Sequence, residues 1–302
     1  MSAHHRVVLD TDIGTDVDDL MALALLLGSP AIDLIGITTV YGDTKLRAQM
    51  TARILSAANR SVPVHAGART TLSGREVWWA GHEGALHDDL EKERYDSDEA
   101  VRFLVNTVLG SPGEIDLIAI GPLTNIAHAI AEDPRFAESV RHLWIMGGAF
   151  GSDETEHNFR SDVVAARAVF AAGIPTTVTG LEVTRQIHIG APELRRIAGS
   201  GELGRLVQSE IEQWWKFWDT EWNVPHDPVT VLTLTQPDLF RFSDVGVVTI
   251  ADGDEEGVSR FEPGSGGRTR IAIGLDAAAT STAIVDGIVV GSAATAAMGN
   301  PT

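Results

Sequence analysis

The chain has 302 residues, of which 44% are hydrophobic and 22% are charged, a composition typical of a globular protein with a sizeable core. Its formal net charge of −19 argues against nucleic acid or an anionic membrane as a partner, because both are bound through basic surfaces. The sequence contains no cysteine, which excludes disulfides, zinc–thiolate sites and a cysteine nucleophile.

Short apolar runs alternate with amphipathic helical patterns along most of the chain. The predicted strands are residues 7–9, 34–40, 62–66, 115–120, 143–146 and 176–178, and the predicted helices are 20–27, 46–58, 98–109, 124–131 and 162–172. This alternation predicts an α/β fold with a mostly parallel central sheet flanked by helices. Since no repeat or Pro-rich linker divides the chain, we expect a single domain over residues 1–302.

The pattern changes beyond residue 190. A long helix is predicted at 202–222, where Trp214, Trp218 and Trp222 recur at helical spacing, which favours core or subunit packing over a wall for a flat ligand. The Gly- and charge-rich stretch 252–267 predicts a surface loop. The predicted elements after it are a strand pair, or a strand and a helix, at 270–278 and 284–290. Residues 293–302 are expected to form a loose tail.

The N-terminus and the hydrophobic runs indicate where in the cell the protein is expected to lie. MSAHHR leads directly into a strand without the features of a secretory signal, and the apolar run 20–27 is too short to span a bilayer. We therefore expect a cytoplasmic protein without a membrane partner.

Five aspartates separate the first strand from the first helix in the stretch VVLDTDIGTDVDDLMALALLLG: Asp10, Asp12, Asp16, Asp18 and Asp19. Carboxylates held together in a folded cleft repel one another, so either their pKa values rise or a cation binds. A helix N-terminus offsets about 0.3–1 kcal/mol per group, which is small beside that repulsion. A metal is the simpler explanation, and all-oxygen ligands favour calcium or magnesium. Helix capping beside a solvated loop is the alternative.

Polar residues also follow later predicted strands, where an open α/β sheet places its ligands. Asp43 would add a carboxylate near the cluster, with a turn or cap role as the alternative. His82 lies in a Gly-flanked loop, where a simply solvated side chain is the alternative. The Gly121-Pro122 pair leaves nearby carbonyls without regular partners, and a free carbonyl is a suitable calcium ligand.

Two further pairs carry candidate chemistry. Glu156 and Asn158 enter a predicted helix two residues apart and are suited to bind adjacent hydroxyls of a sugar, with helix capping as the alternative. His226 stands directly beside Asp227, and a buried structural His–Asp pair is the alternative.

The motifs DTDIG…DD, TTVYGD, GHEG, GPLTN, MGG, EHN and HDP, taken in this order, resemble the inosine/uridine-type nucleoside hydrolases, a family of calcium-dependent ribohydrolases. The matching stretches run from about residue 7 to residue 276. The resemblance implies a nucleoside hydrolase-like domain, Ca²⁺ as cofactor, a small-molecule nucleoside as substrate, and a homodimer or homotetramer.

The resemblance also implies a metal site. Asp10, Asp19 and Asp227 would ligate calcium through their side chains, and the carbonyl of Ile120 would complete the protein ligands. Calcium would position a water and lower its pKa, with Asp10 as the general base.

The remaining implied roles concern the nucleoside. Asp18, Glu156 and Asn158 would hold the ribose hydroxyls, with Met146 lining the sugar pocket. Asp16 is the alternative to Asp18, because the pair Asp18-Asp19 stands two residues later than the family's spacing. His226 would donate a proton to the leaving base, with His82 as the second candidate, and an acidic pocket would stabilise the oxocarbenium-like transition state.

Several positions depart from the family's pattern. Asp43 replaces the usual Asn, Glu182 a more usual Asp, and His157 a common Phe, while the loop 148–156 is short. His226 stands where the purine-specific branch commonly has Trp, which favours pyrimidine or broad specificity.

Two alternative functions belong to other classes of protein. In a phosphatase with an aspartyl nucleophile, Asp10 would be phosphorylated, Asp12 would be the acid/base and magnesium the cofactor, but the expected Thr arrives one position late, at Thr15. The other alternative is a catalytically lapsed nucleoside-binding protein. An EF-hand is excluded because Met21 stands where the closing Glu is required.

Overall fold

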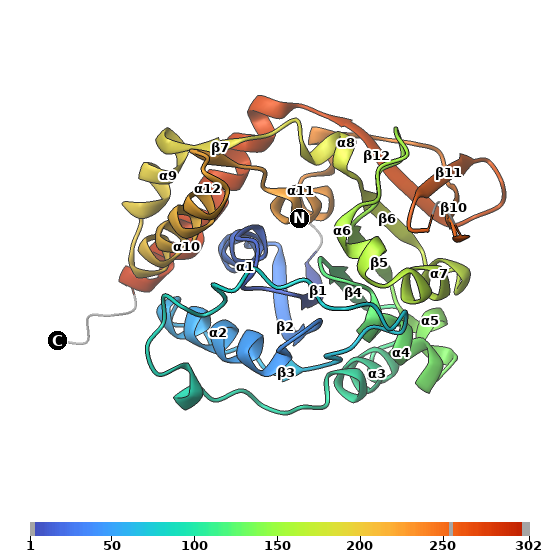
Figure 1. Cartoon of the computed structure of the whole chain (residues 1–302), viewed down its shortest axis with the longest axis horizontal. Coiled ribbons are helices and arrows are strands. Elements are labelled where there is room, and N and C mark those ends of the chain that lie inside the picture. Colours follow the sequence, from blue (N-terminus) through green and yellow to red (C-terminus); the bar gives the residue numbers. More distant parts are fainter. Residues whose placement is uncertain (1–3, 254–255, 298–302) are drawn as a thin grey trace.

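In residues 4–253 and 256–297, which the computed structural model describes, ten strands form one central sheet (Figure 1). Its order is β11-β10-β12-β6-β5-β4-β1-β2-β3, and β9 pairs with β12. Neighbouring strands from β12 to β3 are all parallel. These strands are β1 (His5–Thr11), β2 (Ile32–Thr39), β3 (Val64–Ala66), β4 (Ile115–Ala119), β5 (His142–Met146), β6 (Thr176–Thr179) and β12 (Thr269–Leu275).

The other end of the sheet is antiparallel. It consists of β9 (Phe240–Phe242), β10 (Gly246–Ile250) and β11 (Ser259–Pro263). A separate two-stranded sheet pairs β7 (Ile189–Gly190) with β8 (Trp222–Asn223). The predicted α/β fold with a mostly parallel sheet flanked by helices is therefore confirmed.

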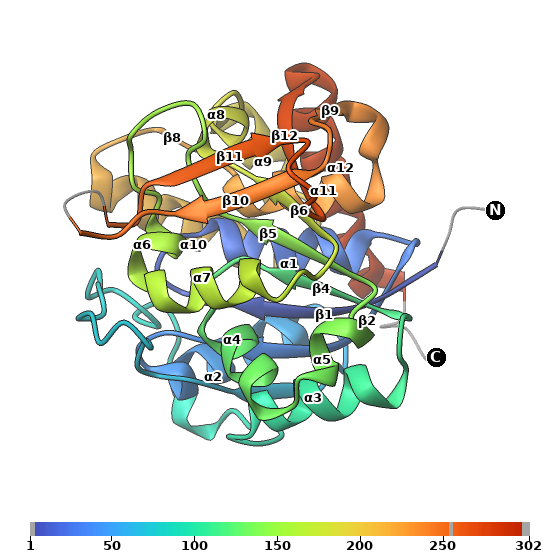
Figure 2. The ribbon, with the colours of Figure 1, turned by 90° about the vertical axis from the view of Figure 1, so that its right-hand side faces the viewer.

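Helices cover both faces of the sheet, as Figure 2 shows, with α7, α4 and α5 in front of the parallel strands and α1 behind them. The longer helices are α1 (Asp18–Gly28), α2 (Thr44–Ala57), α3 (Ala100–Gly110), α4 (Thr124–Glu132), α7 (Val163–Ala171), α9 (Ala191–Ala198), α10 (Glu202–Trp218), α11 (His226–Thr235) and α12 (Ala277–Ala297). The shorter ones are α5 (Arg135–Ser139), α6 (His157–Ser161), α8 (Leu181–Thr184) and the 3₁₀ turns η1 (Leu90–Lys92) and η2 (Pro237–Leu239).

The two faces arise from the alternation of side chains along each strand. In β1, Val7 and Leu9 pack with α1, α11 and α12 in one hydrophobic core, and Val8 packs with α3, α4 and α7 in the other. Helix α1 is apolar on all sides because the sheet covers it on one side and α11 and α12 cover it on the other.

The order of the strands determines where a ligand site belongs. From β1 the chain continues to β2 and β3 on one side, whereas β4, β5, β6 and β12 follow one another on the other side. Parallel sheets bind ligands beyond the carboxyl ends of their strands at such a switch point. The switch lies between β1 and β4, the strands that end at Thr11 and Ala119.

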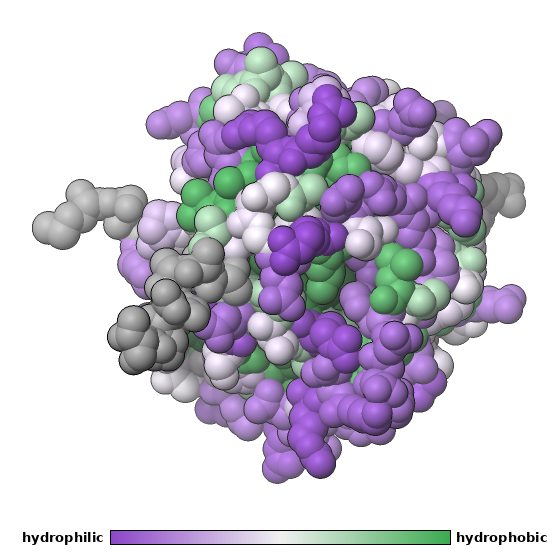
Figure 3. Space-filling view, turned by 90° about the vertical axis from the view of Figure 1, so that its left-hand side faces the viewer, coloured by the Kyte–Doolittle hydropathy of each residue, from purple (hydrophilic) through white to green (hydrophobic). Residues whose placement is uncertain are grey.

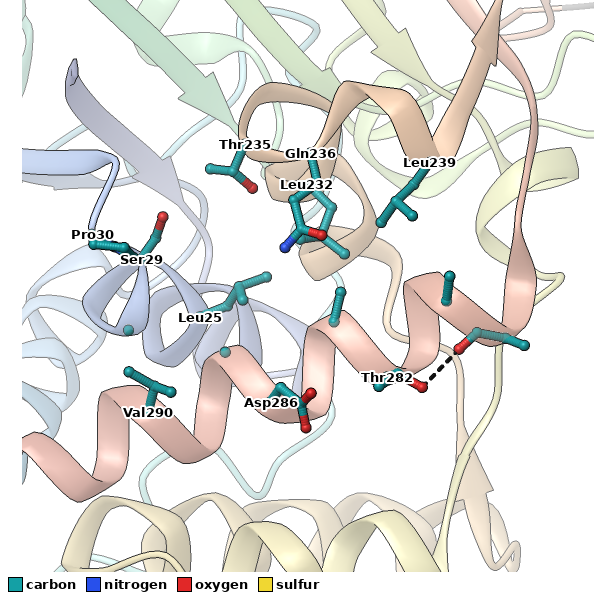
Figure 4. A pocket seen from close by; sticks show the side chains of 15 residues that line it. Leu25, Ser29, Pro30, Leu232, Thr235, Gln236, Leu239, Thr282, Asp286 and Val290 are labelled. Atoms are coloured by element: carbon teal, nitrogen blue, oxygen red, sulfur yellow. Dashed lines mark hydrogen bonds between the residues drawn. The ribbon is translucent and has the colours of Figure 1, made fainter. Parts of the chain in front are cut away.

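Glycines bring α1 and α12 into close contact. A Cβ atom at Gly28 would lie 2.0 Å from the carbonyl oxygen of Gly287 and 2.6 Å from the nitrogen of Gly291. A groove of about 620 Å³ remains between the ends of α1, α11 and α12, and Figure 4 shows Leu25, Leu232 and Val290 along it. The groove is apart from the switch point, so we regard it as a packing feature.

Some predictions about the later chain were wrong. Helix α10 ends at Trp218 rather than at residue 222, because the chain turns there and Trp222 begins β8. The stretch 252–267, predicted as a loop, contains strand β11, and β10 was not predicted. Both strands are short and antiparallel: β10 pairs with β11 and β12, and β11 is the edge strand that pairs with β10, which the local pattern does not reveal.

The tail prediction was also wrong in part. Helix α12 continues to Ala297, so residues 293–297 are helical because this helix packs along α1. Residues 298–302 and, in the predicted loop, 254–255 lie outside the described residues. No helix of the described ranges combines the length and apolar content needed to cross a membrane.

The tryptophan prediction was only partly right. Trp215 is the buried member of α10, and its Nε1 donates to Asn223 Oδ1 at 3.0 Å. Trp218 and Trp222 are exposed, so their helical spacing does not place them in the core of this chain. The side of the molecule where α9 and α10 lie is largely hydrophilic with hydrophobic patches between polar side chains (Figure 3).

The glycine contact gives a testable prediction. Gly28→Ala places a methyl group against backbone atoms of α12 that have no rotamer to adjust, so we expect a loss of about 1–3 kcal/mol in the free energy of unfolding. The matched control is Gly110→Ala at the end of α3, where a Cβ meets nothing within 4 Å. Urea unfolding of both variants measures the difference, and equal midpoints would show that α12 does not pack this closely.

Candidate active site

A cavity of about 310 Å³ opens at the switch point, beyond the carboxyl ends of β1, β4 and β5. Its wall contains residues from the loop after β1, from α6 and from α11, which are far apart in the sequence. The lining residues are Asp12, Thr15, Asp16, Asp18, Asp19, Trp78, Ile120, Met146, Glu154, Thr155, Glu156, His157, Asn158, Arg160, Leu181, Arg185, Trp214, His226 and Asp227.

Three aspartates form the most concentrated carboxylate group. Asp18 and Asp19 begin α1, Asp227 stands in the first turn of α11, and one oxygen of each lies within 4.8 Å of the others. All three are buried. Burial first, and then the neighbouring carboxylates, hold the pKa of each well above its usual value.

This group fits a hard divalent cation. Carboxylate oxygens are the preferred ligands of calcium and magnesium, and a cation would remove the repulsion that raises these pKa values. Ile120, directly after β4, lines the same cavity. Its carbonyl oxygen accepts a hydrogen bond from Asn158 Nδ2 at 2.9 Å and keeps a second lone pair.

The placement of Asp10 differs from the prediction. Asp10 is still part of β1, between β2 and β4, and its Oδ1 accepts from Thr38 Oγ1 at 2.5 Å and from Asn125 Nδ2 at 2.7 Å. It is not among the cavity-lining residues or the three grouped carboxylates, because strand pairing holds it below the cavity floor. Asp12, one residue beyond the strand, lines the cavity instead.

Burial raises the pKa of Asp10 to about 7, and the bonds from Asn125 and Thr38 only partly oppose this rise. Its Oδ2 has no hydrogen-bond partner. The same placement argues against the phosphatase alternative, because an aspartyl nucleophile must face the substrate.

Asp43 and His82 also lie outside the cavity wall. Asp43 is the N-cap of α2, where its Oδ1 accepts from the nitrogen of Leu46 at 3.3 Å, so it has the cap role that was the alternative to a site carboxylate. His82 lies near the rim, with Nε2 3.0 Å from the carbonyl oxygen of Thr15, and its ring meets Phe217 edge-on at 5.1 Å. Glu83 of the same GHEG motif also contacts the aspartate loop, because its carboxylate accepts from Thr15 Oγ1 at 3.0 Å.

Glu156 and Asn158 both line the cavity, and Glu156 also caps α6. Glu156 Oε1 accepts from the nitrogen of Asn158 at 2.7 Å, and its Oε2 accepts from the nitrogen of Phe159 at 3.0 Å. Burial raises the pKa of Glu156 despite these bonds. Met146 at the end of β5 lines the same wall, and its carbonyl accepts from Asn158 Nδ2 at 3.2 Å.

His226 stands at the start of α11 and lines the cavity. Its Nδ1 lies 2.7 Å from Thr184 Oγ1, a contact that orients the ring. Burial first, and then the charge of Arg185, lower the pKa of His226 to about 4. The imidazole is therefore neutral near pH 7 and offers one N–H donor.

Two tryptophans also line the cavity, and the ion pair beside them was not predicted. The tryptophans are Trp78 and Trp214, and the ring of Trp78 meets His157 edge-on at 5.9 Å. Arg185 forms a two-bond ion pair with Glu154, at 2.6 and 2.7 Å. The position of Trp78 before GHEG was the available signal, whereas nothing local in the sequence pairs Glu154 with Arg185.

The comparisons with known proteins agree with one another. The family profile described as inosine-uridine preferring nucleoside hydrolase matches residues 7–282. Uridine nucleosidase 1 of Arabidopsis thaliana is 32% identical over 270 residues, which cover 83% of this chain and 79% of that protein. The pyrimidine-specific ribonucleoside hydrolase RihB of Shigella flexneri is 28% identical over 260 residues, covering 80% and 82% of the two proteins.

A solved structure agrees with this match. The plant nucleoside hydrolase PpNRh1 superposes with a TM-score of 0.84 at 27% identity, and the match covers 94% of this chain and 99% of that one. The family profile spans most of the chain, and the cavity is lined by Asp12, Asp18 and Asp19 of the DTDIG…DD motif. The chain therefore belongs to the inosine-uridine preferring nucleoside hydrolase family and is an enzyme of that class.

Proposed function

We propose that the protein hydrolyses the N-glycosidic bond of ribonucleosides to ribose and free base, with calcium as its cofactor. The observation that carries the proposal is the buried group of Asp18, Asp19 and Asp227 in a cavity at the switch point of the sheet. An acidic wall of this kind stabilises the positive charge that develops on the ribosyl group as the bond breaks.

The cation site would consist of Asp18, Asp19 and Asp227 with the carbonyl of Ile120. When bound, the cation supplies a polarised water whose pKa is lowered. Asp12 would serve as the general base toward the attacking water, in place of the predicted Asp10, because Asp12 is the first aspartate beyond β1 and lines the cavity.

The ribose would lie against the wall formed by Glu156, Asn158 and Met146. Glu156 keeps acceptor capacity for a sugar hydroxyl because a carboxylate has four lone-pair sites. Asp18 belongs to both the carboxylate group and the cavity wall, and we propose that it accepts a ribose hydroxyl beside the cation. Asp16 lines the same cavity, and burial raises its pKa to about 7.

The leaving base would lie between Trp78 and Trp214, with His226 donating to it. Aromatic faces stack on a nucleobase of either class. The relatives named uridine nucleosidase and pyrimidine-specific hydrolase support uridine as the preferred substrate. The proposal also includes a cytoplasmic location and assembly into a homodimer or homotetramer. Light scattering on the purified protein tests the assembly.

The first experiment measures base release by chromatography from inosine, adenosine, guanosine, uridine and cytidine, with calcium and with chelator. We expect release that depends on calcium and is fastest for uridine. Nucleoside binding without base release, with calcium bound, would favour the catalytically lapsed alternative and would refute the proposed activity.

A comparison of two aspartates tests the general base. Asp12→Asn removes the proposed base, so we expect kcat for uridine to fall by about 10²–10⁴-fold. Asp10→Asn is the matched control, since an amide oxygen can still accept from Thr38 and Asn125, and its kcat is expected to change far less. A larger loss in Asp10→Asn, at an unchanged melting temperature, would instead assign the base to Asp10.

The role of His226 is tested by changing the leaving group. His226→Ala is expected to lower kcat for uridine by about 10²–10⁴-fold, because the departing base loses its hydrogen-bond donor. A nitrophenyl riboside, whose leaving group needs no proton, should be cleaved at nearly the wild-type rate. Equal losses on both substrates would mean that His226 shapes the cavity and does not assist the leaving group.

A further inference from the structure

Arg47 of α2 is a buried arginine directly beside the aspartate loop. Only 1% of its surface is exposed, and it is the bulkiest fully buried side chain of the described residues. An arginine is rarely buried without a carboxylate partner, because removing its charge from water is costly. The structural setting of Arg47 therefore needs an explanation.

The hydrogen bonds of Arg47 all go to neutral oxygens. Its Nη1 donates to the carbonyls of Asp12 and Ile13, and the second of these distances is 2.8 Å. Its Nε donates to the carbonyl of Tyr41 at 2.7 Å, and its Nη2 donates to Thr15 Oγ1 at 3.2 Å. The guanidinium thus holds the backbone of the aspartate loop without a direct ion pair.

The surroundings keep this cation away from water. The ring of Trp79 lies over the guanidinium, 4.9 Å from its carbon. Thr15 Oγ1 accepts from Arg47 and donates to Glu83, so the GHEG turn is joined to the aspartate loop through one hydroxyl. Charges interact strongly in such a poorly solvated region.

The charge of Arg47 acts most on two aspartates of the cavity, Asp12 as the proposed general base and Asp19 of the proposed cation site. The positive charge of Arg47 opposes the rise in the pKa of Asp12 and of Asp19, while Glu83 acts on Arg47 from the other side. A fixed cation in this position lowers the repulsion among the carboxylates when no metal is bound. It also repels a metal that enters.

We propose that Arg47 is a fixed counter-ion of the carboxylate group, which stabilises the metal-free site and weakens its affinity for a divalent cation. This inference rests on the cation site of the proposed function but not on hydrolysis. Arg47 is a positioning residue, since it contacts backbone carbonyls, Thr15 and the Trp79 ring and does not line the cavity.

The test compares thermal unfolding, followed by near-ultraviolet circular dichroism, in chelator and in calcium. Arg47→Gln removes the charge and keeps hydrogen-bond donors, whereas Arg47→Lys keeps the charge. The matched control is Arg53→Gln in the same helix, which changes the net charge equally but affects only the ion pair with Glu93 and a hydrogen bond to the Asp88 carbonyl, both away from the aspartate loop. Calorimetry measures the calcium dissociation constant of each protein.

We expect calcium to raise the melting temperature of Arg47→Gln more than that of the wild type, and to bind it about tenfold more tightly. Arg47→Lys and Arg53→Gln should respond as the wild type does. An equal calcium response in the wild type and in Arg47→Gln, or weaker binding by Arg47→Gln, would overturn the proposal and leave Arg47 a purely structural residue.

Folding failure is also informative. If Arg47→Gln is unfolded in chelator and folds with calcium, the counter-ion role is supported. If Arg47→Gln is unfolded in chelator and in calcium, the calcium affinity of Arg47→Lys decides whether charge matters. An affinity equal to that of the wild type supports the role of the charge, and a changed affinity refutes it. A wild type that does not respond to calcium would refute the proposed cation site itself, whereas base-release assays test hydrolysis separately.

Discussion

The structure depends on keeping several carboxylates close together in a buried place. Asp18, Asp19 and Asp227 lie within 4.8 Å of one another through one oxygen each, and Asp12 and Asp16 line the same cavity. The N-termini of α1 and α11 contribute about 0.3–1 kcal/mol per group, which does not balance this repulsion. The site is therefore suited to a cation, and the fold supplies rigid elements that prevent the carboxylates from moving apart.

The parallel sheet provides this rigidity. Each side chain of the cavity floor follows a strand whose position is set by two neighbours, and α1 is packed on all sides by β1, α11 and α12. Because the strand order reverses between β1 and β4, the segments after β1, β4 and β5 meet at one edge. The other elements add what the sheet cannot: Trp78 from a loop and Trp214 from α10 line the cavity, and Arg47 of α2 lies beneath the aspartates.

The family and the parallel strands could be predicted because each rests on local information. The motif order identified the family, and apolar runs of the right length predicted β1, β2, β4, β5 and β6. The strands β10 and β11 were missed because such short antiparallel strands have little pattern of their own. Asp43 shows the same limit of local sequence patterns. A carboxylate before a helix has the same local sequence whether it caps the helix or binds a ligand.

What the sequence by itself determined is the family, the α/β fold and the set of residues available for chemistry, because motifs and periodicity are properties of neighbouring positions. Only the tertiary structure placed Asp12 in the cavity wall and Asp10 within β1, grouped Asp227 with Asp18 and Asp19, and placed Arg47 under the aspartate loop. The physical reason is distance. Whether two charges interact depends on how strands and helices pack, and more than 200 positions separate Asp19 from Asp227 along the chain.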